Sequence, residues 1–235
     1  LRVIDRLHHD AALAGSLGSD RIGCLRSDRS GLVWVGTWGA GLMRHDPSTR
    51  AFMHWRYSPE RRDGPTHPSI VRSLSLANGQ LWLGTNGNGI DVMDREGRLI
   101  GGYRADPARP GALSDGSITA LAQGPDQSLW AATLNGSLHR LAPGAGDFRR
   151  FDAGDGLPRG PIRTMAFAPD GALWVGSSEG MARIGRDLTV RAFAHDPDDA
   201  NSLSGRAVES LAFARDGTLW VGTENGLNAF DTNTG

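Results

Sequence analysis

Seven histidines are the residues of this sequence best suited to metal binding or acid–base chemistry. His9 and His195 occupy matching contexts, because each is followed by an aspartate in a polar segment. A metal site in a repeat protein needs His, Asp or Glu at equivalent positions of several repeats, and these two are a poor match to that rule. Asp196, Asp198 and Asp199 lack the spacing and turn glycine of an EF-hand. We interpret both histidines as parts of polar connectors.

Motifs for catalysis are absent from the sequence. It contains no P-loop, no G-x-S-x-G and no H-E-x-x-H, and its many glycines recur with the repeat described below. The single cysteine, Cys24, can form neither an internal disulfide nor a cysteine-based zinc site. The sequence therefore predicts no enzyme activity and no cofactor.

One position varies in type while its neighbours repeat, and it is our candidate for ligand contact. It directly follows a Thr or Ser that recurs five times, and it holds Trp38, Asn86, Leu134, Ser178 and Glu224. An exposed Trp38 indole suits stacking on a sugar ring, and amide or carboxylate groups suit its hydroxyls. The predicted ligand-binding residues are Trp38, Asn86, Asn88, Asn135, Ser178, Glu224 and Asn225. The alternatives are unconstrained surface and, for Trp38, local packing.

Five tryptophans define the element that must position these residues. Trp34, Trp82, Trp130, Trp174 and Trp220 are spaced by 48, 48, 44 and 46 residues, in runs such as LVWVGT and ALWVGS. A β-branched residue stands twelve positions before each of them, and a glycine followed by an apolar residue stands after each. Each unit therefore predicts four short strands, with the tryptophan buried on the second.

Four strands at this period are typical of a β-propeller blade. The sequence predicts an all-β, single-domain β-propeller of five four-stranded antiparallel blades over residues 1–235. The repeats span about 19–57, 67–103, 115–151, 160–193 and 205–231, and the outer strands end near Tyr57, Tyr103, Phe151 and Phe193. We place Trp55 on an outer strand, at a core edge or a protein interface.

The two ends of the sequence complement one another. The fifth repeat stops after its third strand, and residues 1–7 read as an unattached fourth strand. Pairing of residues 2–7 with the strand near 227–230 would close the ring and remove two open sheet edges. The alternative is a slice of a larger, seven-bladed propeller. Because the first residue is leucine, we expect the sequence to be a piece of a longer protein.

Charge and hydropathy exclude two classes of partner. The formal net charge is −1, which offers no basic surface for a phosphate backbone, so we expect no nucleic acid. No apolar run approaches the roughly 20 residues of a membrane span, and no signal peptide is present. On the expected innermost strands, Arg163 and Glu209 occupy consecutive repeats, and we predict that they form a structural ion pair.

These residues resemble the two-component regulator propeller repeat. The resemblance rests on I-x-x-L, then D-x-x-G-x-L-W-V-G-T, then G-L-x-R-x-D, as in MAFAPDGALWVGSSEGMARI, and on the connector DPDDANSLSG at 196–205. It implies the periplasmic, ligand-sensing part of an inner-membrane receptor, with a histidine kinase or diguanylate cyclase as the output domain. It also implies partnership with downstream receptor domains and a small ligand such as a saccharide. The third repeat departs from the pattern, since Ala131 and Ala132 replace V-G.

Two other functions stay open at this stage. A propeller lyase or lactonase would need several titratable groups at one channel mouth, and the sequence offers few at equivalent positions. A passive scaffold would bind a protein or a second copy, giving a homodimer through its outer strands. The sequence upstream and downstream would separate these functions most directly.

Overall fold

A computed structural model describes residues 5–13, 15–27, 30–49, 51–58, 64–75 and 79–232. These residues form an all-β structure whose one helix is a single 3-10 turn, Ala153–Asp155. No helix in these ranges is long and apolar enough to cross a membrane. The strands of the first two sheets are β1 (Ile22–Ser27), β2 (Val33–Thr37), β3 (Leu42–Asp46), β4 (Ala51–Trp55), β5 (Ile70–Ser75), β6 (Leu81–Thr85), β7 (Ile90–Met93) and β8 (Leu99–Tyr103).

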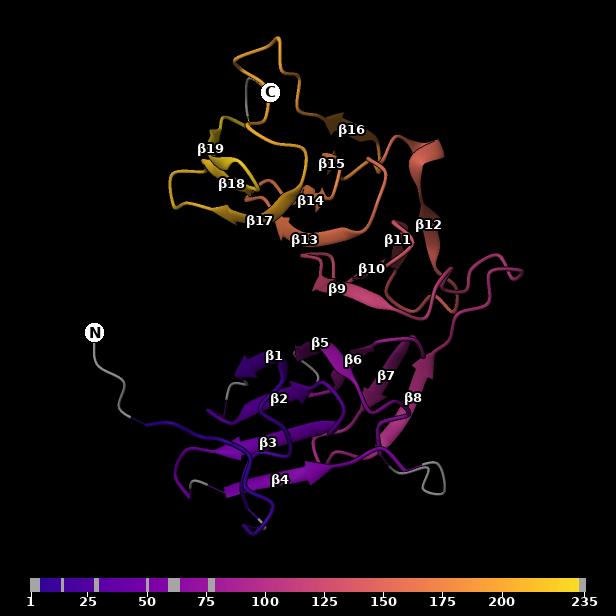
Figure 1. Ribbon diagram of the computed structural model, residues 1–235. Coiled ribbons are helices and arrows are strands. Elements are labelled where there is room, and N and C mark those ends of the chain that lie inside the picture. The colour runs from indigo at the N-terminus through magenta and orange to yellow at the C-terminus, as the bar shows by residue number, and fades with distance from the viewer. Residues whose placement is uncertain are drawn as a thin grey trace. The chain divides into compact units, whose positions relative to one another are not determined.

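The remaining strands form three further sheets. They are β9 (Ile118–Gln123), β10 (Leu129–Thr133), β11 (Leu138–Leu141), β12 (Arg149–Phe151), β13 (Ile162–Phe167), β14 (Leu173–Ser177), β15 (Gly180–Ile184), β16 (Val190–Phe193), β17 (Val208–Phe213), β18 (Leu219–Thr223) and β19 (Gly226–Phe230). Strands lie in each sheet in chain order, antiparallel to their neighbours (Figure 1). Four sheets have four strands, and the fifth, β17-β18-β19, has three among the described residues. The repeat inferred from the tryptophans is confirmed.

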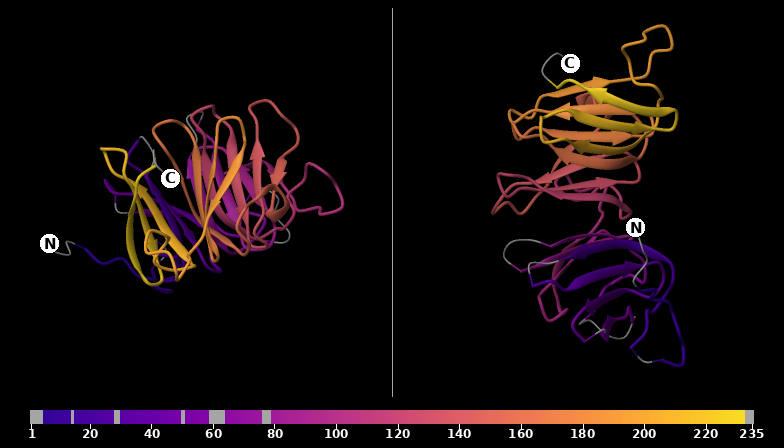
Figure 2. Two further views of the ribbon diagram at one scale, coloured as in Figure 1. Left: turned by 90° about the horizontal axis from the view of Figure 1, so that it is seen from above. Right: turned by 90° about the vertical axis from the view of Figure 1, so that its left-hand side faces the viewer.

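The chain divides into two compact units with separate cores. The first comprises residues 1–104 and 116–118, and the second comprises residues 105–115 and 119–235. In the first unit, Trp34 and Leu42 of one sheet pack against Ile70, Leu83 and Met93 of the next. In the second, Figure 2 shows β13–β16 stacked on β17–β19, where the core includes residues 174, 181, 208, 219 and 221.

Each buried tryptophan stacks on an aromatic residue of the fourth strand of its own sheet. The ring centroids are 5.5 Å apart for Trp34 and Trp55, and 5.4 Å apart for Trp174 and Phe193. Trp82 stacks on Tyr103 and Trp130 on Phe151 in the same way. Trp55, rather than Tyr57, is therefore the aromatic residue that ends the first outer strand. This correction places Trp55 at a core edge.

The prediction that Trp220 is buried is wrong for the described structure. Its side chain is 41% exposed, whereas Trp34, Trp82, Trp130 and Trp174 are 1–7% exposed. The reason is that the described residues of the fifth sheet include no fourth strand, so Trp220 lacks the aromatic partner that the other four have. Leu227 on β19 is also exposed, at 67%.

Closure by the N-terminal strand stays a prediction. Residues 1–4 lie outside the described residues, and Asp5–Leu7 form no strand. Among the described residues, β19 pairs only with β18.

Candidate functional site

The turn between the second and third strands of each sheet carries the predicted ligand-facing residues. A hydroxyl at the end of the second strand closes this turn by donating to a backbone carbonyl, as Thr37 Oγ1 does to Gly41 O at 2.9 Å. Thr85, Thr133, Ser177 and Thr223 make the equivalent bond in the other four sheets. The recurring Thr or Ser is therefore explained by backbone geometry.

The residue after this hydroxyl has a fixed backbone and an outward side chain. Its N–H donates to the carbonyl of the residue just before the first strand, as Trp38 does to Arg21 and Asn86 to Ser69. Ser178 and Glu224 repeat the pattern with Pro161 and Ala207. Trp38 is 39% exposed and Leu134 is 50% exposed, so the structure places this position at the surface.

Three of the predicted ligand-binding side chains already have internal partners. Asn88 Nδ2 donates to Thr66 Oγ1 at 2.6 Å. Asn135 Oδ1 accepts from Thr133 Oγ1 at 2.8 Å. The Glu224 carboxylate accepts from the Arg206 and Ala207 N–H groups at 3.0 and 3.2 Å.

The other four side chains make no hydrogen bond within the described ranges. They are Trp38, Asn86, Ser178 and Asn225. Trp38, Asn86 and Asn88 belong to the first unit, whereas Asn135, Ser178, Glu224 and Asn225 belong to the second. The predicted ligand-binding residues are thus divided between the two units.

A second position on the same turn end escaped sequence reasoning, and we call it the acceptor position. It lies on the third strand, where the register pairs Val35 with Met43, Leu83 with Asp91 and Ala131 with His139. The same register pairs Val175 with Ala182 and Val221 with Asn228. The acceptor position is thus occupied by Met43, Asp91, His139, Ala182 and Asn228.

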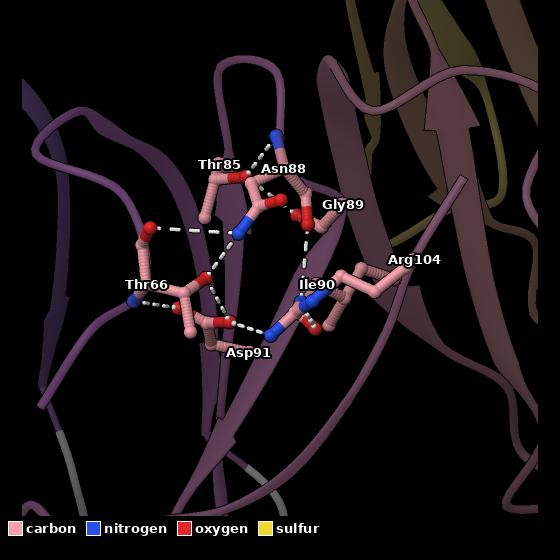
Figure 3. Close-up of polar contacts among 7 residues, drawn as sticks. All are labelled: Thr66, Thr85, Asn88, Gly89, Ile90, Asp91 and Arg104. Atoms are coloured by element: carbon pink, nitrogen blue, oxygen red, sulfur yellow. Dashed lines mark hydrogen bonds and ion pairs between the residues drawn. The ribbon is translucent and has the colours of Figure 1, made fainter. Parts of the chain in front are cut away.

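In the second sheet this position holds a fully buried carboxylate (Figure 3). Asp91 Oδ2 accepts from the Thr66 N–H at 2.7 Å, and its Oδ1 accepts from the Thr66 hydroxyl at 2.8 Å. Arg104 Nη2 donates to Asp91 Oδ1 at 2.8 Å, and its Nη1 donates to the carbonyls of Asn88 and Ile90. Because the Arg104 side chain is 39% exposed, the pair reaches from the core to solvent.

In the third sheet the acceptor is a neutral imidazole. His139 Nε2 accepts from the Ser114 N–H at 3.0 Å, which requires the proton on Nδ1. The ring is fully buried, and Phe148 meets it edge-on at 6.0 Å. Burial lowers the pKa of His139 to about 4. The Arg150 charge adds to this shift, while the Ala131 backbone and Asp115 oppose it.

The first and fifth sheets use a thioether and an amide for the same purpose. The Gly18 N–H points at Met43 Sδ at 3.0 Å, and Asn228 Oδ1 accepts from the Ser204 N–H at 2.9 Å. The donors Gly18, Thr66, Ser114 and Ser204 each follow a buried residue: Leu17, Pro65, Leu113 and Leu203. We call this residue of the connector the donor position.

The fourth sheet lacks both partners. Its connector has Pro158 after the buried Leu157, and proline has no backbone N–H to donate. Its acceptor position is Ala182, which is fully buried and has no polar side-chain atom. An unpaired buried polar group is costly, so the loss of the donor and the loss of the acceptor belong together. The donor and acceptor positions therefore hold the connectors in place.

The first strands of four sheets, β1, β5, β13 and β17, contain a bulge at the residue after the β-branched one. Register shifts fall between Ile162 and Thr164 and between Val208 and Ser210, leaving Arg163 and Glu209 as the extra residues. A bulge re-aims a side chain away from the strand's alternation. The Arg163 guanidinium and the Glu209 carboxylate form an ion pair, as predicted, and both side chains are nearly half exposed.

The matching histidines of the connectors have matching structural roles. His9 Nδ1 contacts the Leu17 carbonyl at 2.6 Å, and His195 Nδ1 contacts the Leu203 carbonyl at 2.5 Å. The next residue donates its N–H to a serine hydroxyl in both connectors. Within the described ranges, no group of three or more His, Cys, Asp or Glu residues could hold a metal ion.

The repeats match a known family at two places. Residues 16–39 and 202–225 match the family described as the two component regulator propeller. These two segments of the chain are therefore similar to the two-component regulator propeller repeat. Each matched segment runs from the end of a connector, including the donor position, to the turn after the second strand. No curated protein shows significant sequence similarity to the chain.

Several solved structures of other proteins have the same fold as this chain. The extracellular domain of the putative hybrid two component system BT3049 from B. thetaiotaomicron matches with a TM-score of 0.79 and 16% identity, over 96% of this chain and 28% of that one. Virginiamycin B lyase from Staphylococcus aureus matches with a TM-score of 0.69 and 17% identity, over 91% and 67%. The WD40 beta propeller domain of Doa1 matches with a TM-score of 0.63 and 12% identity, over 88% and 62%. At these identities the likeness shows the β-propeller fold alone.

Proposed function

We propose that this chain is the ligand-sensing propeller of a membrane-bound signalling receptor, lies outside the cytoplasm and is not itself catalytic. The propeller-repeat match supports the signalling role. The structural similarity to the extracellular domain of the putative hybrid two component system BT3049 supports the location. Because the chain spans 28% of that neighbour's length, the activity of a whole receptor is part of the proposal. The receptor domains downstream are the proposed partners.

The observation that carries ligand sensing is the state of Trp38. Its backbone is held by Arg21, its indole is 39% exposed, and its ring nitrogen makes no hydrogen bond within the described residues. An exposed indole with a fixed backbone and no internal hydrogen bond is suited to stack on the flat face of a sugar ring. Asn86 in the same unit adds a free amide for hydroxyl groups. We therefore propose a small polar ligand of the saccharide class.

Calorimetric titration of the chain with a panel of oligosaccharides and small organic acids tests this function. We expect saturable binding of a saccharide, and we expect Trp38→Ala to abolish it while the melting temperature stays within a few degrees. Leu134→Ala is the matched control, because Leu134 holds the equivalent place in the third sheet and is 50% exposed. Binding that survives Trp38→Ala, or that is lost equally in Leu134→Ala, would contradict the proposal.

A further inference from the structure

A cavity of about 390 Å³ lies within the second unit, at the end of its sheets opposite the turns that carry Asn135 and Ser178. It is bounded by the turn between β9 and β10, the turn between β13 and β14, and the turn between β15 and β16. Its apolar wall consists of Trp130, Phe167, Leu173, Ile184 and Leu188. This volume falls in the usual range for small-molecule sites, roughly 300–1,000 Å³.

Backbone strain marks two of the turns around the cavity. Among the described residues, only two that are not glycine have a positive φ: Gln127 at 66° and Leu188 at 67°. Gln127 stands where the corresponding turns have Gly31, Gly79, Gly171 and Gly217, and it adjoins the cavity residue Asp126. Leu188 stands where the second sheet has Gly97, and it lines the cavity itself. A side chain in this conformation costs on the order of 1 kcal/mol.

Leu188 puts an apolar side chain where a glycine would be relaxed. It packs against the core cluster around Trp130 and completes the apolar wall. Backbone strain of this kind occurs at functional sites, so the positive φ of Leu188 supports a ligand-binding role for the wall that Leu188 completes.

The rim of the cavity carries one more positive charge than its carboxylates neutralise. Arg140 Nη2 donates to Asp126 Oδ2 at 2.6 Å and lies over the Trp130 ring at 5.8 Å. Arg186 is exposed at the mouth and makes no hydrogen bond or ion pair within the described residues.

Two acidic residues near Arg186 are already bonded elsewhere. Asp187 Oδ1 accepts from the Thr189 hydroxyl at 2.8 Å, and Asp170 Oδ2 accepts from Arg183 at 2.8 Å. The Ala172 N–H chiefly, and Arg183 and Arg186 to a smaller extent, lower the pKa of Asp170, while partial burial opposes them. Arg186 therefore has a long-range attraction to Asp170 but keeps all its donors for another acceptor.

We propose that this cavity binds a small aromatic carboxylate, with the ring against Phe167 and Leu188 and the carboxylate on the Arg186 guanidinium. The apolar wall selects a compact ring, and the surplus guanidinium selects a single negative charge, which it can bind with two parallel hydrogen bonds. The site is independent of the proposed saccharide site, because it lies in the second unit and uses none of that site's residues.

Titration with phenylacetate, followed by calorimetry and by tryptophan fluorescence, tests the proposal. We expect saturable binding and about tenfold weaker binding in Arg186→Gln, the loss of one charge-assisted contact. Phenylacetamide has the same ring without the charge, so it should bind the wild type more weakly than phenylacetate does. It should bind the wild type and the Arg186→Gln variant with equal affinity. Arg215→Gln is the control, since Arg215 lies exposed on the turn between β17 and β18, is not among the residues that line the cavity, and makes no bond within the described residues.

Leu188→Gly separates a binding role from a packing role. If Leu188 shapes the site, this variant loses affinity for phenylacetate whatever the change in its melting temperature, because relief of the left-handed strain and loss of packing on the core act in opposite directions. A lower melting temperature with unchanged affinity would assign Leu188 to packing and count against the proposal. Absence of phenylacetate binding, or equal binding by Arg186→Gln, would overturn it. Trp38→Ala should leave phenylacetate binding unchanged, so this test and that of the saccharide site can fail separately.

Discussion

The second and fourth sheets solve one structural problem in opposite ways. In the second sheet, the Thr66 N–H is buried against a charged acceptor, Asp91, which also takes a hydrogen bond from Arg104. In the fourth sheet, Pro158 offers no N–H and Ala182 no acceptor. Both arrangements leave no unpaired polar group where the connector meets the third strand. The comparison teaches that the fold requires matched partners at these two positions and accepts any chemistry that provides the match.

Asp91→Ala should have the largest effect on this match. It removes the acceptor of the Thr66 N–H and hydroxyl and leaves Arg104 without its carboxylate, so we expect a loss of about 3 kcal/mol in the free energy of unfolding. Urea denaturation measures it. Asp91→Asn keeps an acceptor for the Thr66 N–H and should lose clearly less. An Asp91→Ala protein as stable as the wild type would refute the pinning role.

Lowering the pH should weaken the third sheet, because its acceptor is His139. The pKa of His139 is about 4 in the folded chain, against 6.5 for a free histidine. Between these values the unfolded chain binds a proton that the folded chain does not. The contribution of neutral His139 to the free energy of unfolding is therefore fully present above pH 6.5. It is lost as the pH falls toward 4, by up to about 3 kcal/mol.

The comparison with His139→Gln isolates this effect. Gln keeps an acceptor for the Ser114 N–H but does not titrate, so its stability should change less between pH 7 and pH 4.5. Carboxylates and the other buried histidine, His54, whose pKa burial also lowers, contribute equally to both proteins. If the denaturation midpoints of the wild type and the His139→Gln variant changed with pH in the same way, His139 would not be the source of the loss of stability.

Ala182→Asn tests the fourth sheet directly. The larger side chain enters a fully buried site with no donor opposite, so we expect a loss of about 1–3 kcal/mol. Adding Pro158→Ser supplies an N–H and should recover part of that loss. A double variant that is less stable than the sum of the single changes would argue against the donor–acceptor match.

Asn228→Ala should have the smallest effect. The Ser204 N–H loses a neutral acceptor at an exposed connector, where water can replace it, so we expect about 1 kcal/mol. Thermal denaturation with Asn225→Ala as the neighbouring control measures it. If Asn228→Ala lowered the free energy of unfolding as much as Asp91→Ala does, then burial and charge of the acceptor would not determine the size of the loss.

The sequence predicted the repeat well because its signal is a residue type at a fixed spacing. Trp34, Trp82, Trp130 and Trp174 are buried as predicted, and Arg163 pairs with Glu209. Trp220 differs because burial depends on a fourth strand, which a tryptophan motif does not encode. The end of the first outer strand was predicted at Tyr57 and lies at Trp55. Both residues are aromatic, and the spacing alone does not tell which of them stacks on Trp34.

The acceptor position was missed because Met43, Asp91, His139 and Asn228 share a geometry but no residue type. The same fact bears on the predicted ligand site. Variation at a repeated position was taken there to favour ligand contact, yet the acceptor position varies as much and is structural. Asn88, a predicted ligand residue, bonds to Thr66 within the same pinned connector. The joint occurrence of Pro158 and Ala182 was the signal in the sequence that could have revealed the match.

The link between donor and acceptor spans a fixed stretch of chain. Gly18 and Met43, Thr66 and Asp91, and Ser114 and His139 are each 25 residues apart, and Ser204 and Asn228 are 24 apart. Both halves of the match therefore lie on one stretch shorter than the 44–48-residue repeat. A gene segment that is duplicated or deleted as a whole repeat carries both partners with it, so blade number can change in evolution without leaving a connector unpaired.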